Sequence, residues 1–339
     1  MFNKDARSST RGSILVIALW SLCLLATFAV CLGYSVRQKA TMVHRLEERD
    51  SLRLIAEAGV KKAIAEIRKE EHKTYDTLGD AWSNSVVNFK NIALGGGTAD
   101  VCYEYPDESG LTGVQYGMID EERKININTA NATILRRFFR MALGFNQMEA
   151  QNMAARIIDW RDKDTGWSIP FGSAEDSDYG NLPYPYGAKD WDFEVPDELL
   201  LVKDITPELY DRMKNYVTVY GSGKVNINTA PGVVLLSLGL RKDMVAAIIA
   251  FRNGADNVAG TLDDGFFVSS TDVPLVLARL VTMSHADINK VGALLENSIS
   301  TTSDYFEVRS LARIGRSRNT LEAVCVIDRG GKILNWRES

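Results

Sequence analysis

The sequence has few of the residues from which catalytic and metal centres are usually built. Its 339 residues include three histidines and four cysteines. The histidines, His44, His72 and His285, are far apart. They form no pattern typical of a metal site or of a nucleophile with its base. With no catalytic constellation in the chain, we do not expect an enzyme.

The four cysteines are too few for a fold that depends mainly on disulfides. Cys23 and Cys31 lie inside an apolar run, and Cys102 and Cys325 lie in segments typical of strands. The second pair could be small buried hydrophobic side chains, or a disulfide if the compartment is oxidising. The sequence leaves both alternatives open.

Charge is absent from one long stretch near the N-terminus. The 21 residues from Ser13 to Gly33 include no Asp, Glu, Lys or Arg. About 20 helical residues span a bilayer core, whereas the apolar part of a signal peptide has roughly 7–15. Lys4, Arg7 and Arg11 precede the run. This predicts a membrane-spanning helix with its short N-terminus in the cytoplasm and the bulk of the protein outside.

The chain after the apolar run is also expected to be helical. Apolar residues recur on one face up to about His72, and no proline precedes Pro106. One unbroken helix from about Ser13 is therefore predicted. A single-pass anchor followed by a separate helix is the alternative.

A basic leader that ends in Gly12, followed by this apolar run and an amphipathic helix, resembles a type IV prepilin or pseudopilin. The resemblance implies that a prepilin peptidase cuts between Gly12 and Ser13 and that the apolar stem is retained; in this family the new N-terminus is often methylated. The family usually has a glutamate at the fifth mature position, where it neutralises the terminal amine of the neighbouring subunit. Here that position is Ile17. Because an unpaired carboxylate in an apolar environment is costly, its absence points to a subunit at the filament tip.

Strand-forming residues recur in two parts of the chain, 76–122 and 298–339, on either side of a mostly helical segment, 123–297. The end of the chain reads as three antiparallel strands with a hairpin turn at "RGG", residues 329–331.

The helical segment contains an internal repeat, K-[IV]-N-I-N-T-A, which begins at Lys124 and again at Lys224. Each copy predicts a short strand, a helix capped by Thr129 or Thr229, and a second helix. These units resemble helix-hairpin-helix motifs, which often bind DNA. However, residues 123–297 contain 18 Lys and Arg against 22 Asp and Glu, and a hairpin position expected to be glycine is Asp204. We therefore expect the repeats to pack against protein, with a membrane-anchored DNA-binding receptor as the alternative function.

Acidic residues are dense in "DWRDKDTGWSIPFGSAEDSDY", after the first helix pair. A solvated loop and a calcium site both fit this composition, because Ca²⁺ takes six to eight oxygen ligands. The spacing is not that of an EF-hand. The candidate ligands are Asp159, Asp162, Asp164, Glu175, Asp176 and Asp178.

Together, the leader, the missing glutamate, "IIDWRDKD", "ELLLVKDITPELY" and "VNINTAP" resemble the K-type minor pseudopilins of type II secretion, the general secretion pathway protein K family. The resemblance implies an α+β fold: a pilin-like long N-terminal helix plus an antiparallel sheet, with a large inserted α-helical domain that contains two helix-hairpin-helix-like repeats. It also implies calcium binding in the insert, with Asp162, Asp164, Glu175 and Asp178 favoured over Asp159 and Asp176.

The same resemblance implies a minor pseudopilin at the pseudopilus tip, a single-pass protein of the inner membrane with its bulk in the periplasm. The implied partners are I-type and J-type minor pseudopilins and the prepilin peptidase, with secreted substrate or the secretin as further candidates and no nucleic acid. The expected organisation is leader 1–12, N-terminal helix 13–75, strand region 76–122, helical insert 123–297 and C-terminal strands 298–339.

Overall fold

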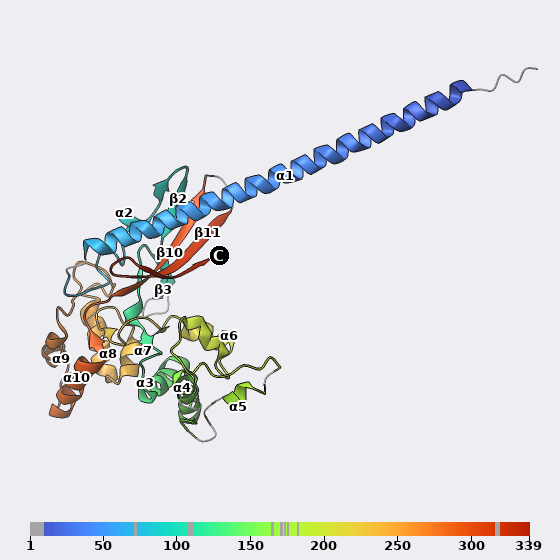
Figure 1. Cartoon of the computed structure of the whole chain (residues 1–339). Helices are drawn as coiled ribbons and strands as arrows, with labels where there is room; N and C mark the ends of the chain where they lie inside the picture. Colours follow the sequence, from blue (N-terminus) through green and yellow to red (C-terminus); the bar gives the residue numbers. More distant parts are fainter. Residues whose placement is uncertain are drawn as a thin grey trace, which may run out of the picture. The chain divides into compact units, whose positions relative to one another are not determined.

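A computed structural model describes residues 10–70, 73–106, 112–163, 166–169, 172, 174, 176–181, 183–315 and 319–339. By its internal packing the chain divides into two compact units, Met1–Leu54 and Ile55–Ser339. Helix α1, Thr10–Lys69, contributes residues to both units (Figure 1).

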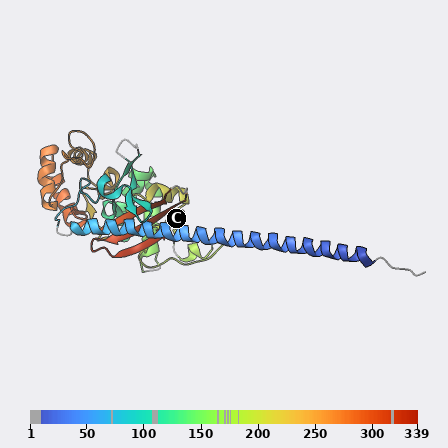
Figure 2. The same cartoon turned by 90° about the horizontal axis from the view of Figure 1, so that it is seen from above.

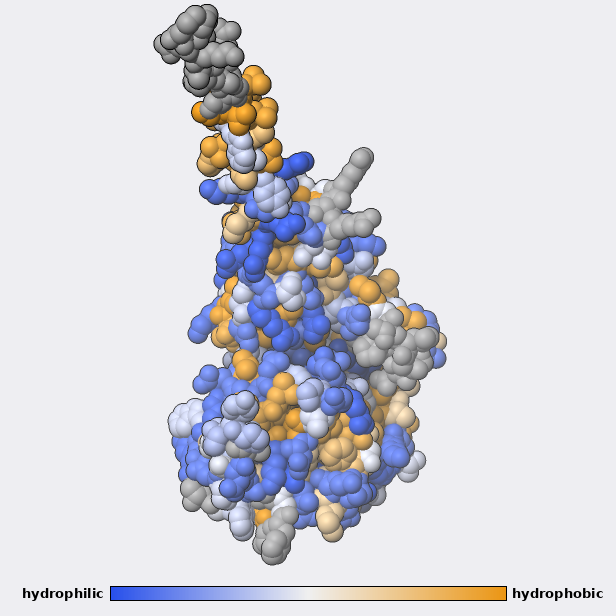
Figure 3. Space-filling model, turned by 90° about the vertical axis from the view of Figure 1, so that its right-hand side faces the viewer, coloured by the Kyte–Doolittle hydropathy of each residue, from blue (hydrophilic) through white to orange (hydrophobic). Residues whose placement is uncertain are grey.

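The described part of the first unit is helical throughout. Every described side chain from Ile14 to Tyr34 is exposed, and most of them are apolar. Figure 3 shows hydrophobic side chains gathered in this part of the chain, near the top of the view. Among the described residues, α1 is the one helix long and apolar enough to cross a membrane. An exposed apolar helix of this length is typical of a membrane anchor.

The second unit is built around an antiparallel sheet of six strands within the described part of the chain. The strands follow the order β1-β2-β10-β11-β12, and β5 pairs with β10 beside β2. The three strands expected at the end of the chain are confirmed, and Asp328 and Lys332 close the hairpin between the last two with a backbone hydrogen bond of 3.0 Å. The bounds are β1 Ile92–Leu94, β2 Gly97–Val101, β5 Ile119–Asp120, β10 Tyr305–Ile314, β11 Thr320–Asp328 and β12 Ile333–Glu338.

The last turns of α1 cover one face of this sheet (Figures 1 and 2). Val60, Ala63 and Ile67 are fully buried in an apolar cluster with side chains of β10 and β11. Gly59 permits the close approach, because a Cβ at this position would lie 2.2 Å from Ser310 Oγ. The other members of the cluster are Trp82, Phe89, Val101, Met118, Phe306, Val308, Cys325 and Ile327.

All four cysteines are free thiols, so Cys102 and Cys325 form no disulfide; Cys325 is buried, as the other alternative predicts, whereas Cys102 is half-buried. The backbone N–H of Cys102 donates to Arg309 of β10, whereas Cys325 of β11 lies opposite Val308 on the other side of β10. Strand β10 therefore separates the two thiols. Burial raises the pKa of Cys325 to about 12, so this side chain behaves as a small hydrophobe.

The insert consists of two copies of one arrangement, as the repeated motif predicts. In each copy a two-residue strand from the motif pairs in parallel with a strand at the end of the same copy. Helix α3 packs against both α4 and α7, and one apolar cluster runs through both copies. The first copy contains β6 Ile125–Asn126, α3 Ala132–Leu143, α4 Gln147–Arg161, α5 Asp176–Tyr179, η2 Pro196–Leu201, α6 Pro207–Met213 and β7 Val217–Thr218. The second contains β8 Val225–Asn226, α7 Gly232–Leu238, α8 Lys242–Arg252, η3 Ser270–Asp272, α9 Val273–Leu280, α10 His285–Asn297 and β9 Ile299–Ser300.

The motif asparagines explain why the sequence repeats. The Asn128 side chain donates to the carbonyl of Phe193 at 2.9 Å and accepts from its N–H at 2.8 Å. Asn228 makes the same two bonds, at the same distances, with Phe267. A side-chain amide has both a donor and an acceptor, so it can bond to the N–H and the C=O of one loop residue, as the backbone of a neighbouring strand would. Each copy therefore uses its motif to hold the start of its second half.

The expected helix caps were wrong. Asn131 caps α3 by accepting hydrogen bonds from the N–H groups of Thr133 and Ile134, and α7 begins at Gly232 with Pro231 at its N-cap position and no side-chain cap. The motif ends in a turn, so each helix starts later than we expected. Thr229 is consequently available for another interaction, with Asp120.

The described chain also has a short helix, a further hairpin and a turn that leads into the insert. They are α2 Val86–Phe89, the paired strands β3 Tyr103–Pro106 and β4 Thr112–Gln115, and η1 Glu121–Arg123.

The approach at Gly59 gives a first prediction. Gly59→Leu should destabilise the full-length protein by about 1–3 kcal/mol, because the larger side chain must displace Ser310 and Ala99. Gly292→Leu in α10 is the matched control, since outside its chain neighbours and the backbone of its own helix nothing lies within 4 Å of the added Cβ, and a helix former replaces glycine. Urea unfolding in detergent micelles measures both. Equal stability of the two variants would contradict the packing described here.

Candidate functional site

The residues expected to direct processing and assembly lie at the start of α1. Gly12 and Ser13 are part of the helix, and the structure describes only the backbone of both residues. Ile17 is exposed, at 63% of its full accessible area. The sequence has no acidic residue from Ser13 to Leu46, so this part of α1 offers no carboxylate to a neighbouring amine.

The acidic loop after α4 is partly held by hydrogen bonds of its own. Asp159 is fully buried and accepts from the N–H groups of Ser168 and Ala174 at 3.1 and 3.3 Å. Asp159 therefore holds the loop against the buried side of α4. Asp162 is the C-terminal cap residue of α4.

Two further acids of this loop have partners. Asp176 accepts from the N–H of Ala188 at 2.8 Å, and Asp178 pairs with Lys203 at 2.7 Å. Asp164 and Glu175 lie outside the described residues, so the six-residue ligand set stays a prediction.

A second acidic cluster occupies the corresponding place in the second repeat, and the sequence analysis missed it. Carboxylate oxygens of Asp256, Asp263 and Asp264 lie within 4.8 Å of one another, close enough to share a cation. The cluster lies between α8 and Phe267, as the first acidic loop lies between α4 and Phe193. The hydroxyl of Thr261 and the N–H of Ala255 lower the pKa of Asp263. Alignment of the two repeats places the adjacent pair Asp263 and Asp264 in the loop that corresponds to the first acidic loop. That correspondence is the sequence signal that could have predicted the cluster.

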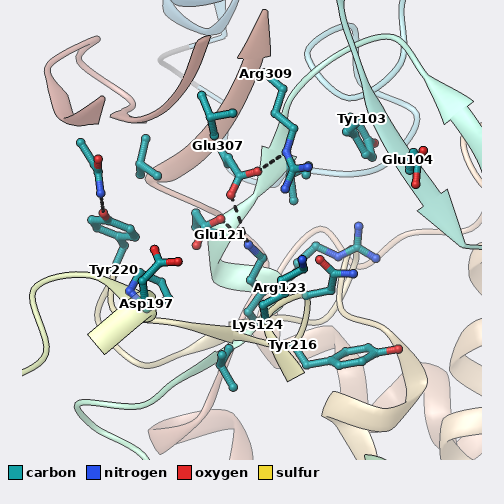
Figure 4. A pocket seen from close by; sticks show the side chains of 18 of the residues that line it. Tyr103, Glu104, Glu121, Arg123, Lys124, Asp197, Tyr216, Tyr220, Glu307 and Arg309 are labelled. Atoms are coloured by element: carbon teal, nitrogen blue, oxygen red, sulfur yellow. Dashed lines mark hydrogen bonds and ion pairs between the residues drawn. The ribbon is translucent and has the colours of Figure 1, made fainter. Parts of the chain in front are cut away.

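A cleft of about 610 Å³ lies between the sheet and the insert, wholly within the second unit (Figure 4). One wall is the sheet face opposite α1, with Glu307 and Arg309 of β10 and Asn335 and Arg337 of β12. The other wall comes from η2, α6 and the segment that leads into β7. Four tyrosines line the cleft as a whole: Tyr103, Tyr210, Tyr216 and Tyr220. Its volume falls within the range of about 300–1,000 Å³ typical of ligand sites.

The charges of the cleft are balanced by ion pairs. Glu307 bonds to Arg309 at 2.5 Å, and Arg337 lies 3.4 Å from Asp197. Lys124 pairs with Glu121 in the buried part of the cleft. Burial by itself raises the pKa of Glu307, but Lys124 and Arg309 outweigh it and lower that pKa. The cleft therefore presents charges of both signs with no dominant field.

Beside the cleft, a buried polar junction joins the insert to the sheet. Asp120, at the end of β5, accepts from Thr229 Oγ1 at 2.5 Å, from Ser303 Oγ at 2.7 Å and from Glu122 N at 2.8 Å. Asp76 bonds to Arg329 at 2.5 Å and accepts from Ser303 N.

Burial dominates the titration of this junction. It raises the pKa of Asp120 to about 6, although the hydroxyls of Thr229 and Ser303 oppose the shift. It raises the pKa of Glu122 to about 7, and Asp120 and Asp304 add to that effect. It also raises the pKa of Asp76, against the effect of Arg329. The sequence showed only the acidic run at 120–122, which carries no hint of these partners.

Comparisons with known proteins agree with this architecture. Residues 114–222 match the family model described as type II secretion system (T2SS), protein K. The type II secretion system protein K of Aeromonas hydrophila is 32% identical over 197 residues, 56% of this chain and 54% of that protein. The chain thus spans about half the length of the curated relative it matches. A chain from the crystal structure of the GspK-GspI-GspJ complex of enterotoxigenic Escherichia coli superposes with a TM-score of 0.66 and 16% identity, over 88% of this chain and 99% of that one.

A long N-terminal helix whose last turns cover an antiparallel sheet, with a helical insert between the strands, is a type IV pilin-like fold of the α+β class. The matched family model and the relative in Aeromonas hydrophila narrow the class further. Over residues 114–222 the chain is similar to the type II secretion system protein K family.

The buried junction predicts an unusual pH dependence. Because the folded-state pKa values of Asp120 and Glu122 lie above the usual values of about 4, both groups bind protons more tightly in the folded chain. Their contribution to stability is complete below about pH 4 and is lost as the pH rises through about 6 to 7. Asp120→Asn keeps an acceptor oxygen but cannot ionise. The free energy of unfolding of this variant should therefore fall by about 1 kcal/mol less than that of the wild type between pH 5 and pH 8.

Urea unfolding at a series of pH values measures this difference. Glu296→Gln, at an exposed acid of α10, is the control and should leave the pH profile unchanged. Parallel profiles for the wild type and Asp120→Asn would refute a titrating junction.

Proposed function

We propose that the protein is a minor pseudopilin of type II secretion, located at the tip of the pseudopilus. The observation that carries this proposal is the helical insert of two repeats in a pilin-like helix and sheet, in a chain that matches protein K. In this proposal α1 anchors the protein once in the inner membrane before assembly, and the second unit lies in the periplasm. Gly12 and Ser13 form the junction cut by the prepilin peptidase.

The tip position follows from the chemistry of the stem. A subunit inside the filament needs a carboxylate to neutralise the amine of the subunit above, and Ile17 cannot supply one. A subunit with nothing above it avoids the cost of a bare carboxylate in an apolar environment. Ile17 therefore supports growth of the filament only below this protein.

The proposed partners are I-type and J-type minor pseudopilins. The solved complex that contains GspK, GspI and GspJ supports this choice. The DNA-binding alternative gains nothing from the structure, because the insert has a net negative charge and the charges of its cleft are balanced.

Deletion of the gene should reduce the proteins exported by type II secretion in the culture medium to background, and the full-length gene should restore them. Ile17→Glu should restore export several-fold less well, because it places an unpaired carboxylate in the stem, whereas Ile17→Val should restore it fully. Quantitative mass spectrometry of the medium measures export. Normal export by the deletion strain would rule out the proposed function.

Co-purification tests the partners separately. The full-length protein, extracted in detergent, should retain tagged I-type and J-type minor pseudopilins from the same cell. Retention of neither would contradict the tip assembly.

We further propose that the acidic loop of the first repeat binds Ca²⁺. Its candidate ligands include Asp162, Asp164, Glu175 and Asp178, and the structure adds Asp190 as a supporting residue. Asp190 lies two residues after the backbone N–H that bonds to Asp176, and its Oδ1 is buried with no hydrogen-bond partner among the described residues. A buried carboxylate oxygen of this kind favours a cation nearby.

Calcium should raise the melting temperature of the full-length protein by about 5 °C at a concentration 100 times its Kd, relative to chelator. The double variant Asp164→Asn, Glu175→Gln should abolish the difference. Asp256→Asn, in the second acidic cluster, is the matched control and should retain it. If only Asp256→Asn removes the difference, the ion binds in the second repeat, and no difference in the wild type would contradict calcium binding.

A further inference from the structure

The outer edge of the sheet runs along the cleft between sheet and insert. Strand β12 pairs with β11, and no other described strand pairs with it. Ser339 and Glu322 exchange both backbone hydrogen bonds, at 3.0 and 3.1 Å. Because successive residues of a strand alternate in direction, Asn335 and Arg337 direct their backbone groups toward β11, and Trp336 directs its N–H and C=O outward.

The side chains of β12 connect this edge to the cleft. Asn335 and Arg337 line the cleft, and Arg337 contacts Asp197 on the opposite wall. Asn335 donates to the hydroxyl of Tyr220 at 3.4 Å. An added strand beside Trp336 would therefore direct alternate side chains to the same face of the sheet as these residues.

The chemistry of the cleft favours a polypeptide over a small ion. Eight of the ten charged side chains that line it form ion pairs with one another, and its acids and bases are equal in number, so the cleft favours neither an anion nor a cation. Tyrosine rings and the fixed ion pairs accept side chains of either sign. The binding energy would come from main-chain hydrogen bonds at the edge, which tolerate many sequences.

Tolerance of sequence also indicates which polypeptide binds. A permanent subunit partner usually buries a more apolar surface that fits one sequence. A polar, charge-balanced cleft beside a free strand edge suits short-lived contact with many different proteins. We propose that the cleft and the edge of β12 bind an extended segment of an exported protein, which adds as a strand beside β12. This inference rests on the proposed function in type II secretion.

Overlapping peptides of about 12 residues, from a protein that disappears from the medium of the deletion strain, are the probe. The full-length protein in detergent micelles should bind some of them, as measured by fluorescence anisotropy. N-methylation of alternate residues, on the edge that faces β12, should raise the Kd at least tenfold because it removes main-chain donors.

Asn215→Trp is the test variant, because Asn215 is an exposed residue of the cleft wall and a large ring there fills the cleft. It should raise the peptide Kd at least tenfold and reduce export, while its melting temperature and its retention of I-type and J-type partners stay unchanged. Met148→Trp, at an exposed position of α4 outside the cleft, is the control and should bind peptides normally. Lys214→Trp takes the place of Asn215→Trp if that variant does not fold.

Three results would overturn the inference while the deletion phenotype still supports the proposed function. The wild type could bind no peptide, the variant and the N-methylated peptides could bind as well as their unmodified counterparts, or the edge could instead pair with a second copy of this chain. Self-association that Asn215→Trp abolishes, without peptide binding, would identify the last case. If the deletion strain exports normally, the proposed function itself fails.

Discussion

The buried carboxylate of Asp120 is the interaction on which the arrangement of the second unit depends. Asp120 lies on β5, which pairs with Phe306 of β10, and its oxygens accept hydrogen bonds from Glu122, Thr229 and Ser303. These donors belong to the segment that enters the insert, to the second repeat and to the segment that returns to the sheet. One side chain therefore holds the start and the end of a long insertion together at the edge of β10.

A polar junction of this kind constrains geometry more than an apolar one. Apolar surfaces can slide against each other at little cost, whereas a buried oxygen that loses its donor costs about 1–3 kcal/mol. Asp120 has several donors at fixed positions, and Asn226 adds another by donating to both Asp120 and Ser303. The insert can therefore take one orientation against the sheet, and the cleft between them keeps a defined shape. The raised pKa of Asp120 is the cost of that constraint.

The sequence predicted the parts of the fold that local patterns encode. The three C-terminal strands follow from alternation and a glycine turn, and the repeat follows from two nearly identical motifs that begin at Lys124 and Lys224. The predicted helix caps were wrong, because the motif ends in a turn and Asn131, two residues after Thr129, takes the N-cap position of α3. The junction could not be predicted, since Asp120 meets Thr229 and Ser303 across 109 and 183 residues. The cleft was missed for the same reason.

The two repeats show how one frame can serve two purposes. Asn128 and Asn228 bond to Phe193 and Phe267, respectively, at the same distances. The two repeats therefore share one frame, in which the motif asparagine fixes the backbone of this phenylalanine. The segments between the helix pair and that phenylalanine differ, with residues 162–192 in the first copy and 253–266 in the second. A loop can lengthen at little thermodynamic cost when its ends are fixed. The frame therefore supplies stability, and the loops and the sheet edge that it leaves accessible are where binding can diverge.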